Sequence, residues 1–386
     1  MPLDPESVLP EALIEEIRSR APGYDERNEF FQEDFDALVA AGYLKAFVPQ
    51  AAGGLGAGLA DAVRLQRRLA QAAPATALAV NMHLVWTGVA KVFSNRGDDT
   101  LAFVLEEAAA GEVFAFGVSE AGNDSVLFDS LTEAAPLPDG GYSFTGTKVF
   151  TSLAPAWTRM GTFGKDTTGP EPRLVWGFIR RDGPGWHHLD DWNTLGMRAS
   201  QSRTTVLEGA AAPADRIVRR LPVGPNPDLL VFGIFSVFET LLAAVYTGVA
   251  ERALVLAVDA AHRRRSHRTG GRAYSQDPDI RWQIAELGMA VDAIVPQLES
   301  VAADIDNLVD RGPAWFRHLS GLKHRATETA KSVVDGAMRV GGGGGYFRGS
   351  ELERLYRDAL AGLYHPSDPE SAHATVATNL LGPIEE

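Results

Sequence analysis

The closing stretch of the chain, which decides the fold, consists of three blocks. They are Arg339-Val-Gly-Gly-Gly-Gly-Gly-Tyr346, Glu353-Arg-Leu-Tyr-Arg-Asp358 and Leu363-Tyr-His-Pro366. A run of glycines lets backbone N–H groups approach a ligand closely, so the first block is either a phosphate-binding loop or a flexible turn between helices. The sequence therefore predicts a glycine-rich turn, a short charged helix and a loop that carries a histidine.

Length, charge and cysteine content limit what the protein can be. The chain has 386 residues, a net charge of −14 and no cysteine. This length predicts two or three domains. The negative charge argues against a nucleic-acid or anionic-membrane partner, and the lack of cysteine excludes zinc–thiolate sites. No signal sequence and no uninterrupted apolar run of about 20 residues is visible, so we expect a cytoplasmic protein without a membrane span.

The hydrophobic pattern divides the chain into three parts. Residues 1–113 show apolar side chains at helical spacing, 114–223 show short β-rich runs broken by turns, and helical spacing returns over 224–386. In the last part, apolar residues three and four positions apart run from Ile284 to Leu308, which predicts a long bundle helix. The predicted order is helical, β, helical.

Three internal motifs and the closing stretch together resemble the acyl-CoA dehydrogenase superfamily. The internal motifs are Phe116-Gly-Val-Ser-Glu-Ala-Gly-Asn-Asp-Ser125, Gly146-Thr-Lys-Val-Phe-Thr-Ser152 and Leu195-Gly-Met-Arg-Ala-Ser-Gln-Ser202. They occur in the family's order and, with the closing stretch, span nearly the whole chain. The resemblance implies the family's α+β multidomain fold: an N-terminal helical domain over 1–113, a central β-sandwich or barrel over 114–223, and a C-terminal four-helix bundle over 224–386.

The same resemblance implies a bound flavin, FAD with FMN as the alternative. A flavin ring needs hydrogen-bond partners at its polar edge and a flat apolar neighbour, and the first two internal motifs offer both. By position, the implied ring contacts are Val118, Ser119, Phe150, Thr151 and Ser152, and the implied phosphate contacts are Arg264, Arg339, Gly342 and Gly343. The basic run around Arg264 is explained equally well as a solvated helix C-terminus.

The usual base of the family is missing from this chain. Most members place a glutamate in the loop after the charged block, where Pro366 stands here. A dehydrogenase needs a carboxylate over the flavin to remove a substrate proton. Glu239 is the rival base, because it lies within one residue of the position that a minority of the family uses. One residue turns a helix by about 100°, so Glu239 is equally well explained as an isolated acid satisfied by an arginine.

Two histidines point to oxygen chemistry instead. His365 lies eight residues after Arg357, as a histidine does in the superfamily's two-component flavin monooxygenases. Those enzymes commonly have a second active-site histidine on an N-terminal helix, which His83 matches, although a single histidine on an apolar helix is more often a satisfied core residue. A histidine titrates near neutral pH, so it suits proton transfer at a flavin. We expect His365 and His83 to face the same cavity.

Three functions remain open from the sequence. The favoured one is a flavin-dependent monooxygenase that receives reduced flavin from a separate reductase and acts on a specialised small molecule. The second is an acyl-CoA dehydrogenase with Glu239 as base, and the third is a non-catalytic flavin-binding family member. The cluster from His187 to Asp191 is expected at the surface, so no metal site is predicted. The family implies a homo-oligomer, a tetramer or a dimer.

Overall fold

The first part of the chain is helical. The computed structural model describes residues 3–384, and its N-terminal helices are α1 (Pro5–Val8), α2 (Glu11–Arg27), α3 (Gln32–Ala40), α4 (Leu59–Ala72), α5 (Pro74–Ser94) and α6 (Ala102–Ala109). Nearly every side chain of α5 is buried, because this helix packs against α4, α7 (Leu229–Arg263) and β1 (Phe114–Gly117). The apolar sequence of α5 therefore reflects its central position.

The middle part is a mostly antiparallel sheet. Its further strands are β2 (Glu133–Pro136), β3 (Tyr142–Thr151), β4 (Arg159–Asp166), β5 (Arg173–Arg180), β6 (Trp186–His188), β7 (Arg203–Ala212) and β8 (Ile217–Pro222). The strands pair in the order β6-β7-β3-β2-β4-β5-β8, and β1 joins β4 in parallel. Side chains such as Phe144, Trp157 and Met160 form a second, separate hydrophobic core on this sheet.

The last part is a bundle of long helices. They are α7, α8 (Pro278–Asp306), α9 (Ala314–Gly341) and α10 (Glu351–Leu360), followed by α11 (Pro369–Leu381). Asp277 caps α8 by accepting hydrogen bonds from the N–H groups of Asp279 and Ile280, which fixes where that helix begins. The predicted apolar seam is buried from Leu287 to Ile305. The prediction that this seam extends to Leu308 is wrong. The helix α8 ends at Asp306, and Leu308 lies beyond it with a positive φ and a half-exposed side chain.

The helix α7 forms the core of the bundle. Among residues 3–384 it is the one helix long and apolar enough to cross a membrane by length and composition, with a mean hydropathy of 2.1 in its most apolar window. However, 83% of that window is buried inside the protein. The packing of α4, α5, α8 and α9 against α7 accounts for this apolar sequence.

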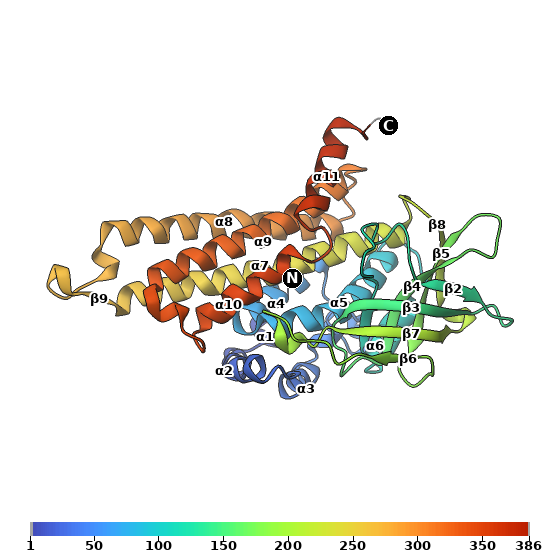
Figure 1. Cartoon of the computed structure of the whole chain (residues 1–386), viewed down its shortest axis with the longest axis horizontal. Helices are drawn as coiled ribbons and strands as arrows, with labels where there is room; N and C mark the ends of the chain where they lie inside the picture. Colours follow the sequence, from blue (N-terminus) through green and yellow to red (C-terminus); the bar gives the residue numbers. More distant parts are fainter. Residues whose placement is uncertain (1–2, 385–386) are drawn as a thin grey trace.

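Figure 1 shows how these parts meet. The long helices α7, α8 and α9 extend to one side, the strands lie at the other end, and the N-terminal helices lie along their junction. The predicted order of helical, β and helical parts is confirmed. The junction brings together α5, β1, β3, the start of α7 and the end of α10, which are the elements that carry most of the predicted site residues.

Candidate active site

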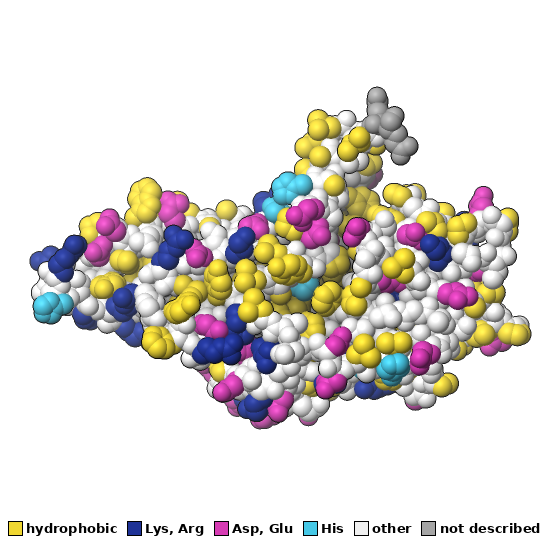
Figure 2. Space-filling view, viewed as in Figure 1, with side chains coloured by type: hydrophobic (Ala, Val, Ile, Leu, Met, Phe, Trp, Pro, Cys, Tyr) yellow, Lys and Arg dark blue, Asp and Glu magenta, His cyan; other side chains and the backbone are white. Residues whose placement is uncertain are grey.

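A cavity of about 270 Å³ lies at this junction. Its walls come from α5, β1, the end of β3, the segment 192–197, α7 and the segment after α10. Most of the lining side chains are apolar, and Figure 2 shows hydrophobic side chains gathered in the middle of one face, between the bundle and the strands. The polar side chains in the lining are Ser119, Ser152, Thr194, Ser202, Arg357 and His365.

A buried ion pair joins the two segments that were predicted to face a flavin ring. Lys148 Nζ donates to Glu120 Oε1 at 2.7 Å, and both side chains are buried. Burial raises the pKa of Glu120, but the Lys148 charge and several hydrogen bonds more than offset it and hold the pKa at about 2. Ser119 precedes Glu120, and the N–H of Val149 donates to the carbonyl of Ser119 at 2.9 Å. The ion pair therefore fixes Ser119 and Phe150 at one cavity wall.

The backbone around Phe150 is strained. Phe150 has φ 59°, and the pairing of β3 with β7 shifts register between Lys148 and Thr151. This bulge leaves the Phe150 ring about half exposed, edge-on to the Trp192 ring at a centroid distance of 6.3 Å. A non-glycine residue at positive φ costs free energy and persists where its surroundings hold it, commonly at functional sites. The bulge thus directs a flat apolar ring toward the cavity.

The other predicted ring contacts differ in position. Ser152 lines the cavity together with Ser119 and Phe150, whereas Val118 is buried in the hydrophobic core. Thr151 is fully buried, and its Oγ1 has no hydrogen-bond partner within residues 3–384. Thr151 is not among the lining residues, so its hydroxyl does not face the cavity, whereas Ser119 and Ser152 bring hydroxyl groups to the wall and Phe150 brings a flat apolar ring. The residues present therefore fit a flavin ring.

The charged block of α10 holds the segment 195–198 against the cavity. Arg357 donates to both carboxylate oxygens of Asp25, at 2.9 and 2.6 Å, and to the carbonyl of Leu195 at 3.0 Å. Asp358 accepts a hydrogen bond from the N–H of Met197 at 2.5 Å. A Cβ on Gly196 would lie 2.2 Å from the carbonyl oxygen of Arg357, so only glycine allows this close approach. The Arg357-Asp358 pair is therefore a structural clamp.

His365 lines the cavity and is anchored by a tyrosine. Its Nε2 lies 2.7 Å from the hydroxyl of Tyr246 on α7, and Tyr246 is buried. Burial, with the nearby Lys323 charge as a second cause, lowers the pKa of His365 to about 3. The imidazole is therefore neutral at physiological pH, with Nε2 paired to Tyr246.

A buried lysine, Lys323, holds the loop that carries His365 through hydrogen bonds. Lys323 Nζ donates to the carbonyl oxygens of Gly362, His365 and Ser367, at 2.8, 3.1 and 2.8 Å. Burial lowers the pKa of Lys323 to about 8, and the charge of Glu239 opposes that shift. A charge removed from water needs a compensating charge, and Glu239 supplies it here.

Glu239 itself lies behind the cavity. It is buried, its Oε2 has no hydrogen-bond partner within residues 3–384, and it is not a lining residue, although its neighbour Phe238 is. Burial raises the pKa of Glu239 to about 7, and the Lys323 charge and the Ser367 hydroxyl oppose the shift. The structure thus places the predicted rival base beside Lys323, on a face of α7 that does not line the cavity.

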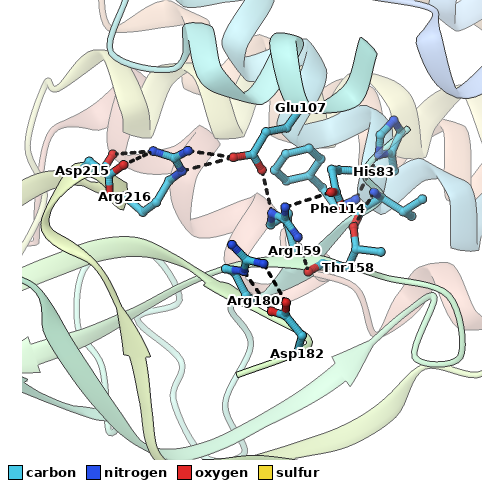
Figure 3. A network of polar contacts seen from close by, with 11 residues as sticks. His83, Glu107, Phe114, Thr158, Arg159, Arg180, Asp182, Asp215 and Arg216 are labelled. Carbon is cyan, nitrogen blue, oxygen red and sulfur yellow. Dashed lines mark hydrogen bonds and ion pairs between the residues drawn. The ribbon is translucent and has the colours of Figure 1, made fainter. Parts of the chain in front are cut away.

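The expectation that His83 faces the same cavity as His365 is wrong. His83 is buried, its Nε2 lies 2.7 Å from the carbonyl oxygen of Leu44, and its Nδ1 accepts from the N–H of Phe114 at 3.1 Å. Figure 3 shows His83 beside Phe114 near a surface ion network that contains Arg159. Burial lowers the pKa of His83 to about 4. With both nitrogens bonded to backbone, His83 ties α5 to β1, while its neighbour Met82 reaches the cavity.

The predicted phosphate contacts lie elsewhere in the molecule. The guanidinium of Arg264 stacks on Tyr274 and donates to the carbonyl of Val340 at 2.5 Å, and a Cβ on Gly342 would lie 2.6 Å from it. The space beside the Cα of Gly343 is open, and the exposed Arg339 forms an ion pair with Asp335. The structure therefore brings Arg264 and Gly342 together, beside Arg339.

This phosphate-side cluster is remote from the cavity of the same chain. Phe238, in the cavity wall, and Arg264 lie 26 residues apart along α7, a separation of about 39 Å at 1.5 Å per residue. That exceeds the length of an extended flavin dinucleotide. One flavin cannot contact both regions of a single chain.

Sequence reasoning missed Lys323, Tyr246 and Trp192. For Lys323 a signal was available: it lies on α9 between the buried residues Leu319 and Ala326, at the spacing of the apolar face. A lysine at such a position is either paired or functional. Tyr246 and Trp192 carried no such signal, because aromatic residues are ordinary in a core.

The comparisons with known proteins agree with this geometry. Residues 9–112 match the family model "Acyl-CoA dehydrogenase, N-terminal domain", and residues 240–367 match "Acyl-CoA dehydrogenase, C-terminal domain". The putative acyl-CoA dehydrogenase YdbM of Bacillus subtilis is 29% identical over 365 residues, which cover 92% of this chain and 91% of that protein. L-evernosamine nitrososynthase of a Micromonospora species is 31% identical over 359 residues, which cover 91% of this chain and 83% of that protein.

Solved structures agree as well. The structure of KijD3 in complex with FMN and dTDP-3-amino-2,3,6-trideoxy-4-keto-3-methyl-D-glucose superimposes with a TM-score of 0.87 and 28% identity, over 100% of this chain and 96% of that chain. With two family models, relatives of nearly full length and a shared fold in agreement, the chain belongs to the acyl-CoA dehydrogenase family.

Proposed function

We propose that this protein is a flavin-dependent monooxygenase, which uses reduced flavin and O2 to oxygenate a specialised small molecule. The proposal rests on one observation, the identity of the polar side chains that line the cavity. Among the described residues, its lining includes His365 and no carboxylate. Removal of a proton beside a carbonyl group needs a base in contact with the substrate, whereas oxygen chemistry needs a dry pocket with well-placed hydrogen bonds.

The relatives support this branch of the family. The name L-evernosamine nitrososynthase describes formation of a nitroso group, which carries oxygen on nitrogen. The KijD3 complex contains FMN and an amino sugar linked to a nucleotide. The cofactor of this chain is accordingly a flavin, with FAD favoured by the phosphate-side cluster of Arg264 and Gly342 and FMN as the alternative.

Three residues of this chain would hold the flavin ring. Ser119 and Ser152 supply hydroxyl groups for its polar edge, and Phe150 supplies an apolar surface. When bound, reduced flavin supplies two electrons to O2, so that one oxygen atom enters the substrate and the other leaves as water. The apolar lining excludes bulk water from this reaction.

His365 is the proposed catalytic residue. Its Nε2 is paired with Tyr246, and its Nδ1 has no hydrogen-bond partner within residues 3–384. A neutral imidazole with one free nitrogen can donate a hydrogen bond or accept a proton at the substrate, according to its tautomer. The low pKa of His365, about 3, keeps the ring in this neutral form.

A second candidate function is acyl-CoA dehydrogenation with Glu239 as base. The observation that favours it is the buried carboxyl itself, with a free Oε2 and a pKa raised to about 7 by burial, a suitable value for a general base. Its position behind the cavity and beside Lys323 argues against this role. A non-catalytic flavin-binding protein is the third alternative, and the open cavity lined by His365 argues against it.

Anaerobic mixing with butyryl-CoA tests the proposal against the dehydrogenase. We expect the absorbance of the oxidised flavin to stay unchanged when butyryl-CoA is added to the flavin-loaded protein. Bleaching of the flavin by this thioester, lost in Glu239→Gln, would overturn the monooxygenase proposal and establish the dehydrogenase. A known acyl-CoA dehydrogenase serves as the positive control.

Partners and location follow from this function. We propose a small-molecule substrate, a separate flavin reductase, and a homo-oligomer in which a second copy brings Arg264 and Gly342 to the cofactor. The net charge of −14 argues against nucleic acid as a partner, and the burial of α7 against a membrane. The cytoplasm is the proposed location.

A further inference from the structure

The cavity contains one formal charge, and that charge is neutralised. Among the described lining residues there is no Asp, Glu or Lys, and Arg357 is the single cation. Arg357 gives its hydrogen bonds to the carboxylates of Asp25 and Glu353 and to the carbonyl of Leu195. Its side chain is 9% exposed. No donor of this guanidinium is left for a phosphate or a carboxylate.

The cations near the cavity also have hydrogen-bond or ion-pair partners within the protein. Arg198, next to the lining residue Met197, donates to the carbonyls of Asp25 and Thr194 and to Asn193. Lys323 donates to three carbonyls of the loop 362–367 and has Glu239 as its counter-charge. Neither of these cations lines the cavity.

The remaining polar groups suit a neutral ligand. Ser152 is assigned to the flavin ring, so the substrate meets the hydroxyl of Ser202, which is hydrogen-bonded to Ser152 at 2.7 Å and to Ser200 at 2.8 Å. The His365 imidazole is paired with Tyr246 through Nε2. These groups can exchange single hydrogen bonds with a substrate, but none of them carries a charge that would balance an ionised group taken out of water.

Aromatic rings form part of the wall. Phe116 and Phe238 stack at a centroid distance of 5.5 Å, and Trp192 lies edge-on at 6.3 Å to Phe150, the ring assigned to the flavin. Such rings contact flat apolar molecules over a large area.

We infer that the part of the substrate bound in this cavity is an uncharged, largely apolar ring compound, and that an acyl chain ending in a carboxylate or an ammonium-bearing sugar is excluded from it. This inference rests on the proposed function, because it names the class of compound that the oxygenation acts on. The chemistry of the wall selects it: rings for stacking, hydroxyls and an imidazole for one or two hydrogen bonds, and no free charge.

Binding of a matched ligand series tests the inference. Isothermal titration calorimetry on the oxidised, flavin-loaded protein would compare 1-naphthalenemethanol with 1-naphthoate and with 1-naphthylmethylammonium, which share one ring system and differ in charge. We expect the alcohol to bind with a Kd of about 1 mM or tighter, as for a fragment of this size. Each ion should bind at least about 10-fold more weakly, because its charge is buried without a partner. Equal or tighter binding of either ion, or no binding of the alcohol, overturns the inference.

A charge-gain variant tests the same point from the protein side. Leu195 lines the cavity with a side chain that is 63% exposed, so it tolerates substitution. Leu195→Lys should raise the affinity for 1-naphthoate relative to the alcohol by about 10-fold, and the neutral control Leu195→Gln should not. An unchanged ratio in Leu195→Lys contradicts the inference. Neither titration involves electrons or oxygen, so its outcome is independent of the butyryl-CoA test.

Discussion

At the scale of single residues, the properties of His365 and His83 come from the partners of their ring nitrogens. Both rings are neutral because burial lowers their pKa values, to about 3 and about 4. His365 lines the cavity and, within residues 3–384, is hydrogen-bonded through Nε2 alone, whereas His83 has both nitrogens bonded to backbone. The same residue type is therefore a proposed catalytic group at one position and a structural tie at the other.

His365→Ala should weaken control of the oxygen reaction without loss of the cofactor. Removal of a positioned hydrogen-bonding group should speed hydrogen peroxide release from the reductase-reduced protein by about 100-fold. Tyr246→Phe, which removes one hydrogen bond to Nε2, should speed it by about 10-fold. The measurement is peroxide formed per second at equal flavin occupancy. Peroxide release at the wild-type rate in His365→Ala would show that the imidazole has no part in the reaction.

His83→Gln should affect stability rather than chemistry. Loss of one or both backbone hydrogen bonds should lower the free energy of unfolding by about 1–3 kcal/mol for each group left unpaired. The folded-state pKa of His83, about 4, lies below the unfolded value of 6.5. The unfolded chain therefore binds more protons between these values, so His83 lowers stability as pH falls from 6.5 toward 4.

Urea unfolding at pH 7.5 and pH 5 checks this prediction. The wild type should lose more stability between the two pH values than His83→Gln does. Faster peroxide release in His83→Gln, at unchanged stability, would instead indicate that His83 takes part in the oxygen reaction.

At the scale of elements, the helices α7 and α9 together hold the loop after α10. Lys323 on α9 binds three carbonyls of the segment 362–367, Tyr246 on α7 binds His365, and Gly362 packs so closely against Thr327 that a Cβ would lie 2.5 Å from its methyl group. Ser367 completes the turn with φ 49°. The position of His365 is thus set by α7 and α9 rather than by its own loop.

Lys323→Met should release this loop. It removes three hydrogen bonds and leaves Glu239 buried without its counter-charge, which should cost about 3–5 kcal/mol of stability. Hydrogen exchange should show faster exchange within 361–368, and urea unfolding gives the loss of stability.

The double variant tests the pairing of Lys323 with Glu239. Lys323→Met combined with Glu239→Gln should be less destabilised than the sum of the two single variants, because the lone buried charge is gone. Simple additivity would mean that Glu239 does not act as the counter-charge. In that case its raised pKa would again favour the general-base role.

At the scale of the whole molecule, the two halves of the implied cofactor site are separated. The cavity lies where the three parts of the chain meet, and Arg264 lies at the far end of α7 beside the glycine turn. About 39 Å of helix lies between them, at 1.5 Å per residue. A second copy of the chain is needed if one flavin is to contact both.

Arg264→Ala tests that arrangement. Loss of a charge-assisted hydrogen bond to a phosphate should weaken FAD binding by about 10-fold or more, although Arg264 is remote from the cavity of its own chain. Arg263→Ala, an exposed neighbour at the end of α7, is the matched control. Flavin fluorescence titration gives both affinities. Equal Kd values for wild type and Arg264→Ala would remove the glycine turn and Arg264 from the cofactor site.

The sequence allowed much of this to be predicted, and the limits are physical. Motif order and hydrophobic spacing predicted the order of the parts, and they placed Ser119, Phe150, Ser152 and His365, which line one cavity. The spacing could not reveal that His83 points away from Met82's side of α5, because one residue turns a helix by about 100°. The same rotation separates Glu239 from Phe238. The burial of Lys323 could be predicted from its place on the apolar face of α9, but its partners could not, because backbone carbonyls leave no pattern of side chains in the sequence.

The reaction of the reduced flavin-loaded protein with O2 is the most direct test of the monooxygenase account. In stopped-flow mixing of the anaerobically reduced protein with oxygenated buffer, the account predicts a clear lag before the oxidised-flavin absorbance returns. The lag should persist in His83→Gln and shorten in His365→Ala. Immediate single-phase return of that absorbance in the wild-type protein, as for a dehydrogenase or free flavin, would contradict the account.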